Sequence, residues 1–233
     1  MKIVAMIPAR LGSKRIKKKN IRLINKKPLI QYVIEKVKKC NIFDEIYLNS
    51  ESEIFNKIAK ENNIKFYKRD KSLSTDKSTN DQFALDFMMN IKSDFLIQVL
   101  PTSPLIEIDE IKKFVNHFTR NNFDTLISVS DHQIASIYKK KPINFNKIKP
   151  NPPSQTMTPI QSYATILMAW NCKRFIYNMK KYDSAYHGGN GKTDYFSLTP
   201  LSCLDIDNED DFNLVERIIL ANNIEISKAK YYK

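Results

Sequence analysis

The stretch KIVAMIPARLGSKRIKKKN, residues 2–20, decides the fold and locates a candidate site. Residues 2–7 form a short apolar run ended by Pro8, a pattern that predicts a buried strand. The loop that follows is rich in arginine and lysine and contains Gly12 and Ser13. A triphosphate carries about four negative charges, and a loop at the carboxyl end of a strand can meet them with cations and backbone N–H groups. The stretch therefore predicts an α/β fold whose first loop binds phosphate.

The residue types in this loop suit phosphate chemistry. Gly12 lets the backbone approach a phosphate closely, and Ser13 adds a hydroxyl donor. Arg10, Lys14 and Lys19 can offset the charge that develops as pyrophosphate leaves. The alternative is a solvated basic loop. The strand before the loop favours the phosphate site, and so does Gly12, which stands apart from the other three glycines.

Strand-like and helix-like segments alternate along the chain beyond this loop. Further strands are expected at residues 45–48, 64–67, 95–100 and 125–129, and helices at 28–39, 51–62, 78–91 and 107–120. The alternation predicts a mostly parallel sheet covered by helices on both faces. Ligands of such sheets bind beyond the carboxyl ends of the strands. We therefore expect a site formed by the loops after Ile7, after Leu100 and after a late strand ending near Leu204.

Apolar periodicity predicts the faces that two of these helices bury. A surface helix places its apolar residues on one stripe, which packs against the core. The residues expected to face inward are Ile54, Ile58 and Ala59 in helix 51–62, and Phe83, Leu85, Phe87 and Met88 in helix 78–91.

Residues 131–165 break the alternation. They hold five prolines, which argue against a helix. Because the segment is too short for a core of its own, we expect an insertion, a lid or a dimerisation segment within a single domain spanning 1–233. Regular structure is expected again at 163–170, in a helix at 172–180 and in a last helix from about 209 to 222. Gly188, Gly189 and Gly191 predict either a flexible lip over the site or a long hairpin turn.

A second motif, LDIDNEDDF at residues 204–212, suits a divalent cation. Asp205 and Asp207 alternate around Ile206, so in an extended chain both carboxylates face the same side. Mg²⁺ accepts one or two protein carboxylates together with phosphate oxygens and water. The alternative is helix capping by Asp207 or Asn208. Both can hold at once, with the two aspartates on the metal and Asn208 at the cap.

Composition excludes several classes of protein. No run approaches the roughly 18 apolar residues of a membrane helix, and no secretory signal pattern opens the chain, so we expect a cytoplasmic protein. The three cysteines form no CxxC pair, and neither GxGxxG nor GxxxxGK[ST] occurs. The net charge of +13 comes from lysines scattered along the chain, which favours a solvated surface over a nucleic-acid site. Neither nucleic acid nor a membrane is expected as a partner.

Several of these motifs together resemble one known family. IPARLGSKRIKKKN at 7–20, KPLI at 27–30, Arg69 with Leu73 and Asp76, PTSPL at 101–105 and LDID at 204–207 before Asp211 are similar to the acylneuraminate cytidylyltransferases, the CMP-sialic acid synthetases. The resemblance spans nearly the whole chain. It implies a Rossmann-like nucleotidyltransferase fold, a requirement for CTP and Mg²⁺, an acidic sugar as acceptor and a homodimer.

The resemblance also implies roles for individual residues. The nucleotide would be held by Ala9, Arg10, Gly12, Ser13, Lys14, Lys19, Asn20, Arg69 and Asn80. Arg10, Lys19, Asp205 and Asp207 would be catalytic, and the two aspartates would bind Mg²⁺. The acceptor hydroxyl would attack the α-phosphorus in line and release pyrophosphate, with no covalent intermediate.

Two departures concern the acceptor sugar. The family usually has glutamine before Pro-Thr-Ser-Pro, where this chain has Leu100, and the 154–170 region lacks the family's arginine. We therefore expect a nonulosonic acid other than ordinary sialic acid, such as legionaminic or pseudaminic acid. Candidate sugar-binding residues are Gln155, Gln161 and Tyr163, with the lysines at 139–141. The alternatives are a 3-deoxy-octulosonate cytidylyltransferase or another sugar nucleotidyltransferase and, more remotely, a non-catalytic protein that binds nucleic acid.

Overall fold

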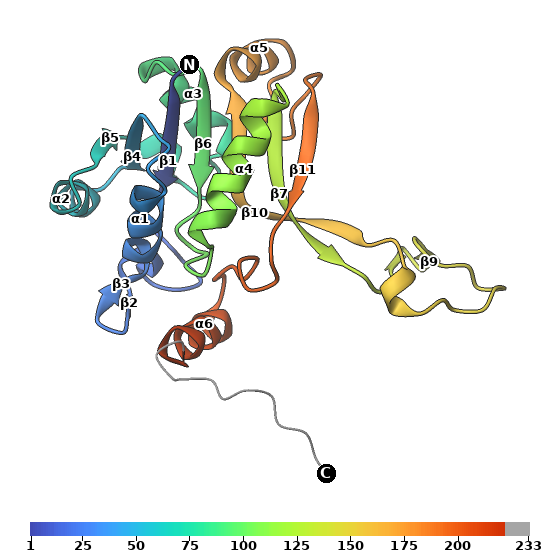
Figure 1. The fold of residues 1–233 in the computed structure, drawn as a ribbon. Helices are drawn as coiled ribbons and strands as arrows, with labels where there is room; N and C mark the ends of the chain where they lie inside the picture. Colours follow the sequence, from blue (N-terminus) through green and yellow to red (C-terminus); the bar gives the residue numbers. More distant parts are fainter. Residues whose placement is uncertain (222–233) are drawn as a thin grey trace.

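A seven-stranded sheet in the order β11-β7-β10-β6-β1-β4-β5 forms the centre of the molecule (Figure 1). The structure, a computed structural model, describes residues 1–221. The strands of the sheet are β1 (Ile3–Pro8), β4 (Glu45–Ser50), β5 (Lys65–Lys68), β6 (Phe95–Val99), β7 (Thr125–His132), β10 (Ile160–Asn171) and β11 (Thr193–Ser197). The helices are α1 (Leu29–Cys40), α2 (Glu53–Glu61), α3 (Asn80–Asn90), α4 (Ile108–Arg120), α5 (Cys172–Tyr182) and α6 (Glu209–Ala221). Shorter elements are the hairpins β2 (Leu23–Ile24) with β3 (Lys27–Pro28) and β8 (Ile137–Tyr138) with β9 (Lys141–Pro142), and 3-10 turns at Lys19–Ile21, Lys71–Ser74 and Ser154–Thr156.

The sheet is mostly parallel, which confirms the fold predicted from the alternation of elements. β1 pairs in parallel with β4 and β6, and the edge strands β5 and β11 are parallel to their neighbours. β10 is antiparallel to both β6 and β7. The carboxyl ends of β1, β4, β6 and β7 therefore meet at one edge of the sheet.

Helices cover both faces of the sheet. α1, α2 and α4 pack on one face, where alternate β1 residues Ala5 and Ile7 are buried. α3 and α5 pack on the other face against Val4 and Met6. Because both faces are covered, every residue of β1 is buried, and this accounts for its continuous apolar run.

The helix at residues 53–61 buries a different residue from the one expected. Ile54 is 40% exposed, so its inward assignment is wrong, and Phe55 is fully buried with Ala59 four residues on. Residues four apart share a helix face, and the larger Phe55 takes the core position. In α3, Phe87 and Met88 are buried as expected, while Phe83 and Leu85 are only partly buried.

The late strand expected near Leu204 is absent from the described part of the chain, and that prediction is wrong. The strand in this region is β11, which ends at Ser197. Its sequence TDYFS is half polar, because it forms an edge of the sheet and is only partly buried. Residues 204–207 belong to no helix or strand, and the Ile206 N–H donates to the Thr102 carbonyl at 2.9 Å, which fixes the segment against the loop after β6.

The glycine cluster forms a packed turn and not a lip over the predicted site. Gly188 has φ +96°, and a Cβ there would lie 2.0 Å from Thr193 Oγ1. The turn leads into β11 beside the first residues of β7, with Asn178 Nδ2 donating to the Gly188 carbonyl at 2.9 Å. The turn therefore lies at the amino ends of these strands, opposite the edge where the basic loop after β1 lies.

A long arm projects from the sheet between β7 and β10 (Figure 1). The two strands extend beyond the sheet as an antiparallel pair, and their ends, at His132 and Ile160, occupy the outer parts of the segment expected to be an insertion. The stretch between them carries the β8–β9 hairpin and one 3-10 turn. Among residues 1–221, no helix combines the length and the apolar character needed to cross a lipid bilayer.

Candidate active site

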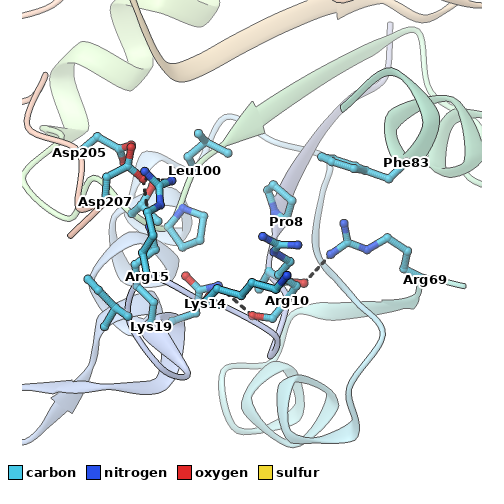
Figure 2. Close-up of a pocket in the computed structure, with 16 residues that line it drawn as sticks. Pro8, Arg10, Lys14, Arg15, Lys19, Arg69, Phe83, Leu100, Asp205 and Asp207 are labelled. Carbon is cyan, nitrogen blue, oxygen red and sulfur yellow. Dashed lines mark hydrogen bonds and ion pairs between the residues drawn. The ribbon is translucent and has the colours of Figure 1, made fainter. Parts of the chain in front are cut away.

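A pocket opens at the carboxyl ends of β1 and β6 (Figure 2). One wall is the basic loop after β1, and the segment carrying Asp205 and Asp207 adjoins it beside Arg15. The lining residues are Pro8, Ala9, Arg10, Ser13, Lys14, Arg15, Ile16, Lys19, Asn20, Arg69, Phe83, Leu100, Pro101, Thr102, Asp205 and Asp207. The first two loops expected from the strand ends therefore meet here, together with the acidic motif.

The basic loop is held by backbone and side-chain contacts at both of its ends. The Ala9 N–H donates to the Asn49 carbonyl at 2.9 Å, and the Leu11 N–H donates to Glu51 Oε1 at 2.8 Å. Ile16 is almost fully buried and fastens the far end of the loop to the core. The fixed backbone leaves the side chains of Arg10, Lys14, Arg15 and Lys19 lining the pocket.

Arg69 braces this loop from beneath. Its guanidinium donates to the carbonyls of Ala9 and Asn49 and lies 4.8 Å from the centre of the Phe83 ring. Its Nε has no partner among the described atoms. Burial lowers the pKa of Arg69 to about 10, with partial compensation from Glu51, so the side chain stays charged at neutral pH.

The two aspartates of the acidic motif lie side by side and point into the pocket (Figure 2). Asp207 Oδ1 accepts from Arg15 Nη2 at 2.8 Å and lies 3.5 Å from Lys19 Nζ. Asp205 Oδ1 accepts from the Ser103 hydroxyl at 3.3 Å. The two carboxylates thus lie at the end of the pocket formed by Arg15 and Lys19.

Helix capping is handled by the residues just after this pair. Asn208 Oδ1 accepts from the Asp211 N–H at 3.0 Å, and Asp211 Oδ2 accepts from the N–H groups of Asp207 and Asn208. The side chain of Asn208 therefore caps α6, while the carboxylates of Asp205 and Asp207 are free to face the pocket. The prediction that Asn208 caps the helix is therefore confirmed, while metal binding by Asp205 and Asp207 stays a prediction.

Lys19 links two parts of the chain that are 187 residues apart. Its side chain is only 13% exposed, and Nζ donates to the Ile206 carbonyl. Arg22 adds a second link, because it pairs with Glu209 and lies 3.8 Å from the Phe212 ring centre. These contacts hold the acidic segment against the basic loop.

The pair Asp205 and Asp207 fits a magnesium ion by the chemistry of its donors. Within the described 221 residues, no group of three or more histidine, cysteine or acidic side chains gathers as a metal site. Mg²⁺ commonly uses one or two carboxylates and completes its octahedron with substrate phosphates and water. Two carboxylates facing a basic pocket match that pattern.

Most of the residues predicted to bind nucleotide meet in this pocket. Those that line it are Ala9, Arg10, Ser13, Lys14, Lys19, Asn20 and Arg69, and the two aspartates predicted to bind the metal, Asp205 and Asp207, line it too. Gly12 does not line it, and a Cβ there would meet no atom within 4 Å, so the close approach that was the reason for glycine stays a prediction. Asn80 begins α3 outside the lining, with its buried Oδ1 lacking a described partner.

The predicted sugar-binding residues lie elsewhere. Gln161 and Tyr163 line a separate hollow with Val129 and Tyr195, and Gln155 lies on the arm. Sequence reasoning missed Arg15 and Phe83 as lining residues. Arg15 could have been predicted, because it lies in the basic loop. Phe83 could not, because its position matches the helical periodicity of a core residue.

Comparisons with known proteins agree with this geometry. Residues 4–166 match the family model described as Cytidylyltransferase. The chain is 30% identical over 169 residues to N-acylneuraminate cytidylyltransferase of Escherichia coli, covering 71% of this chain and 36% of that protein. It is 34% identical over 139 residues to pseudaminic acid cytidylyltransferase of Campylobacter jejuni, covering 57% and 60%. Post-translational flagellin modification protein B of Campylobacter coli is 28% identical, with 96% and 97% covered.

Solved structures show the same fold at low sequence identity. CMP:2-keto-3-deoxy-manno-octonic acid synthetase complexed with CTP superposes with a TM-score of 0.74 at 13% identity, covering 95% of this chain and all of that one. 4-Diphosphocytidyl-2C-methyl-D-erythritol synthase of Anaerococcus prevotii gives 0.68 at 13% identity, covering 94% and 98%. The chain spans only about a third of the length of the first curated relatives that it matches. On the match over residues 4–166, the chain belongs to the cytidylyltransferase family.

Proposed function

We propose that the chain joins CMP from CTP to an acidic sugar of the nonulosonic class and releases pyrophosphate, as a step in the synthesis of surface glycans. One observation carries the proposal: the basic loop after β1 and the Asp205–Asp207 pair converge on one pocket. Relatives that are 30% and 34% identical to the chain over the aligned stretches are named for activity on N-acylneuraminate and pseudaminic acid. Because CTP is a cytoplasmic nucleotide, the proposed reaction belongs in the cytoplasm.

The reaction proposed is an in-line displacement at phosphorus. A hydroxyl oxygen of the sugar forms a bond to the α-phosphorus of CTP as the bond to the bridging oxygen of pyrophosphate breaks. Arg10, Lys14 and Arg15 face the pocket and offset the charge that collects on the leaving group. Lys19 holds the acidic segment in place through the Ile206 carbonyl. The chain therefore contributes positioning and charge stabilisation, with no covalent intermediate.

Magnesium is the proposed cofactor, held by Asp205 and Asp207. The ion would neutralise phosphate charge and polarise the phosphate that is attacked. The two side chains already lie together beside the basic loop, so little rearrangement of the protein is required (Figure 2).

The acceptor proposed is a nonulosonic acid other than ordinary sialic acid, with legionaminic or pseudaminic acid as examples. Leu100 lines the pocket at the end of β6 and can neither donate nor accept a side-chain hydrogen bond. An apolar wall at this point suits a sugar that carries fewer hydroxyl groups. Gln161 and Tyr163, beside the root of the arm, stay candidates for the far end of the sugar, together with Gln155 and the lysines at 139–141.

Pyrophosphate release tests the proposed function. The assay combines each of the four nucleoside triphosphates and Mg²⁺ with a panel of nonulosonic and octulosonic acids. Turnover only with CTP and a nonulosonic acid other than sialic acid is expected. Fastest turnover with sialic acid would refute the acceptor, and fastest turnover with an octulosonic acid would support the alternative enzyme. Absence of both turnover and a thermal shift with CTP would favour the nucleic-acid-binding alternative.

We also propose that the arm pairs two copies of the chain into a homodimer. Several large apolar side chains on the arm are exposed to solvent. Monomeric proteins seldom expose so many large apolar side chains close together. Those on the arm are Ile134, Ile137, Tyr138, Ile143 and Ile148, exposed by 52 to 92%.

Replacing Ile137 by lysine is expected to convert the dimer to monomer at micromolar concentration, because a charge would be buried at the interface. Sedimentation velocity measures the change. Ile54→Lys is the matched control, since Ile54 is exposed on α2, at the other end of the molecule from the arm (Figure 1). A wild-type chain that sediments as a monomer would contradict the proposal.

A further inference from the structure

Asp76 lies beside the phosphate loop and contacts two of its cations. Arg10 Nη1 donates to Asp76 Oδ1 at 2.9 Å, and Lys14 Nζ pairs with Oδ2. The Asp76 side chain is 42% exposed, so it is accessible to solvent and to ligands. Lys14 and then Arg10 hold the pKa of the Asp76 carboxyl below its ordinary value, so the group is ionised at neutral pH.

Asp76 also lines a second hollow that adjoins the pocket. The two cavities share Arg10, Arg69 and Phe83. The remaining wall of the second hollow comes from residues 73–78, the segment before α3. The carboxylate therefore lies where a ligand that occupies the basic pocket meets this segment.

The cations of the pocket are balanced in two groups by carboxylates of the chain. Arg10 and Lys14 pair with Asp76, while Arg15 and Lys19 pair with Asp207. With Arg69 and Asp205 added, five cationic side chains face three carboxylates, which leaves a net formal charge of +2. Asp205 and Asp207 have a role in the proposed reaction as metal ligands. Asp76 has none, although its contacts are of the same kind.

We propose that Asp76 is a resident counter-ion of the phosphate loop, which Arg10 and Lys14 exchange for phosphate oxygens. When the phosphate chain of a nucleotide binds, its oxygens replace the Asp76 carboxylate on both cations. When pyrophosphate leaves, Asp76 pairs with them again. The carboxylate competes with every anion at these two cations, so it weakens the binding of pyrophosphate and speeds its release.

This exchange sets which anions the pocket retains. An anion with one or two charges gains little by displacing a carboxylate that already satisfies both cations. A triphosphate carries enough charge to make the exchange favourable. The inference rests on the proposed function only for the identity of the nucleotide, because the competition itself involves the phosphate chain alone.

Calorimetric titration of the full chain with inorganic pyrophosphate, without nucleotide, tests the proposal. Asp76→Asn is expected to bind pyrophosphate about fivefold more tightly than the wild type at ~0.05 M salt. The gain is expected to shrink towards one at ~0.5 M salt, because ions screen exposed charge pairs. Asp76→Glu, which keeps the charge, is expected to stay near the wild-type affinity, and Asp76→Ser repeats the loss of charge with a different side chain.

Asp70→Asn is the matched control. It removes the same charge six residues earlier, where Asp70 accepts from the Ser72 N–H at 2.7 Å and caps a 3-10 turn. An equal gain in Asp70→Asn would assign the effect to overall charge and overturn the proposal. Unchanged or weaker pyrophosphate binding in both Asp76→Asn and Asp76→Ser would also overturn it. Failure of the wild-type chain to bind CTP would instead refute the proposed function, while the pyrophosphate comparison would stand.

Discussion

Replacing Asp207 by asparagine is expected to slow CTP-dependent pyrophosphate release by at least about a hundredfold, or ~2.7 kcal/mol of transition-state stabilisation. The Asp207 carboxylate faces the pocket, pairs with Arg15 at 2.8 Å and lies 3.5 Å from Lys19 Nζ. Asparagine has the same size but no charge. The proposed magnesium site would therefore keep one carboxylate of two, and Arg15 and Lys19 would lose their charged partner. Steady-state rates at saturating CTP across a magnesium titration measure the loss.

The matched control for this variant is Asp210→Asn. Asp210 lies in the first turn of α6, where its side chain is exposed and outside the pocket lining. The two variants change the net charge equally and are three residues apart. Asp210→Asn is therefore expected to stay within about twofold of the wild-type rate. An Asp207→Asn rate equal to that of Asp210→Asn would show that the acidic motif only caps the helix.

Replacing Lys19 by methionine is expected to lower both activity and stability. The Lys19 ammonium is largely buried, donates to the Ile206 carbonyl and lies beside Asp207. Methionine fills similar space without a donor, so a buried carbonyl loses its partner at a cost of about 1–3 kcal/mol. The acidic segment would lose its buried link to the basic loop and be held only by the more exposed pairs of Arg15 and Arg22, so kcat/KM is expected to fall about a hundredfold. Thermal unfolding and pyrophosphate-release kinetics measure the two effects.

Lys17→Met is the matched control, because it removes one lysine charge from the same loop without removing the contacts that Lys19 makes. Lys17 belongs to the same basic loop and is exposed to solvent, outside the pocket lining. Its removal is expected to change stability by less than about 0.5 kcal/mol and to leave kcat/KM near the wild-type value. Equal losses in the two variants would mean that Lys19 contributes only to the general positive field of the loop.

The order of strands and helices follows from local patterns in the chain. Residues 3–8 are apolar without interruption, which specifies a strand buried on both faces, and β1 is an interior strand of the sheet between β6 and β4. The elements that were missed or rotated lie at the surface. β11 has half-polar side chains at a sheet edge, and α2 turns Phe55 inward in place of Ile54. Periodicity is weak at such positions because partial burial tolerates both polar and apolar residues.

The site divides in the same way between local sequence and tertiary packing. The basic loop and the aspartate pair were recognisable from residue types and spacing, because the charge and conformational freedom that a phosphate or a metal requires are properties of short segments. The partners of these residues were not recognisable. Lys19 meets Ile206, Arg15 meets Asp207 and Arg10 meets Asp76 only after strands far apart in sequence come together in one sheet.

The sequence by itself determined the alternation of strands and helices, the basic loop and the acidic motif, since each is set by residues that are close together in the chain. Tertiary structure alone decided that Asp76 pairs with Arg10 and Lys14 of the loop and that the glycine turn lies opposite the pocket. These outcomes depend on strand order and on the docking of segments up to 192 residues apart, which local propensities do not encode.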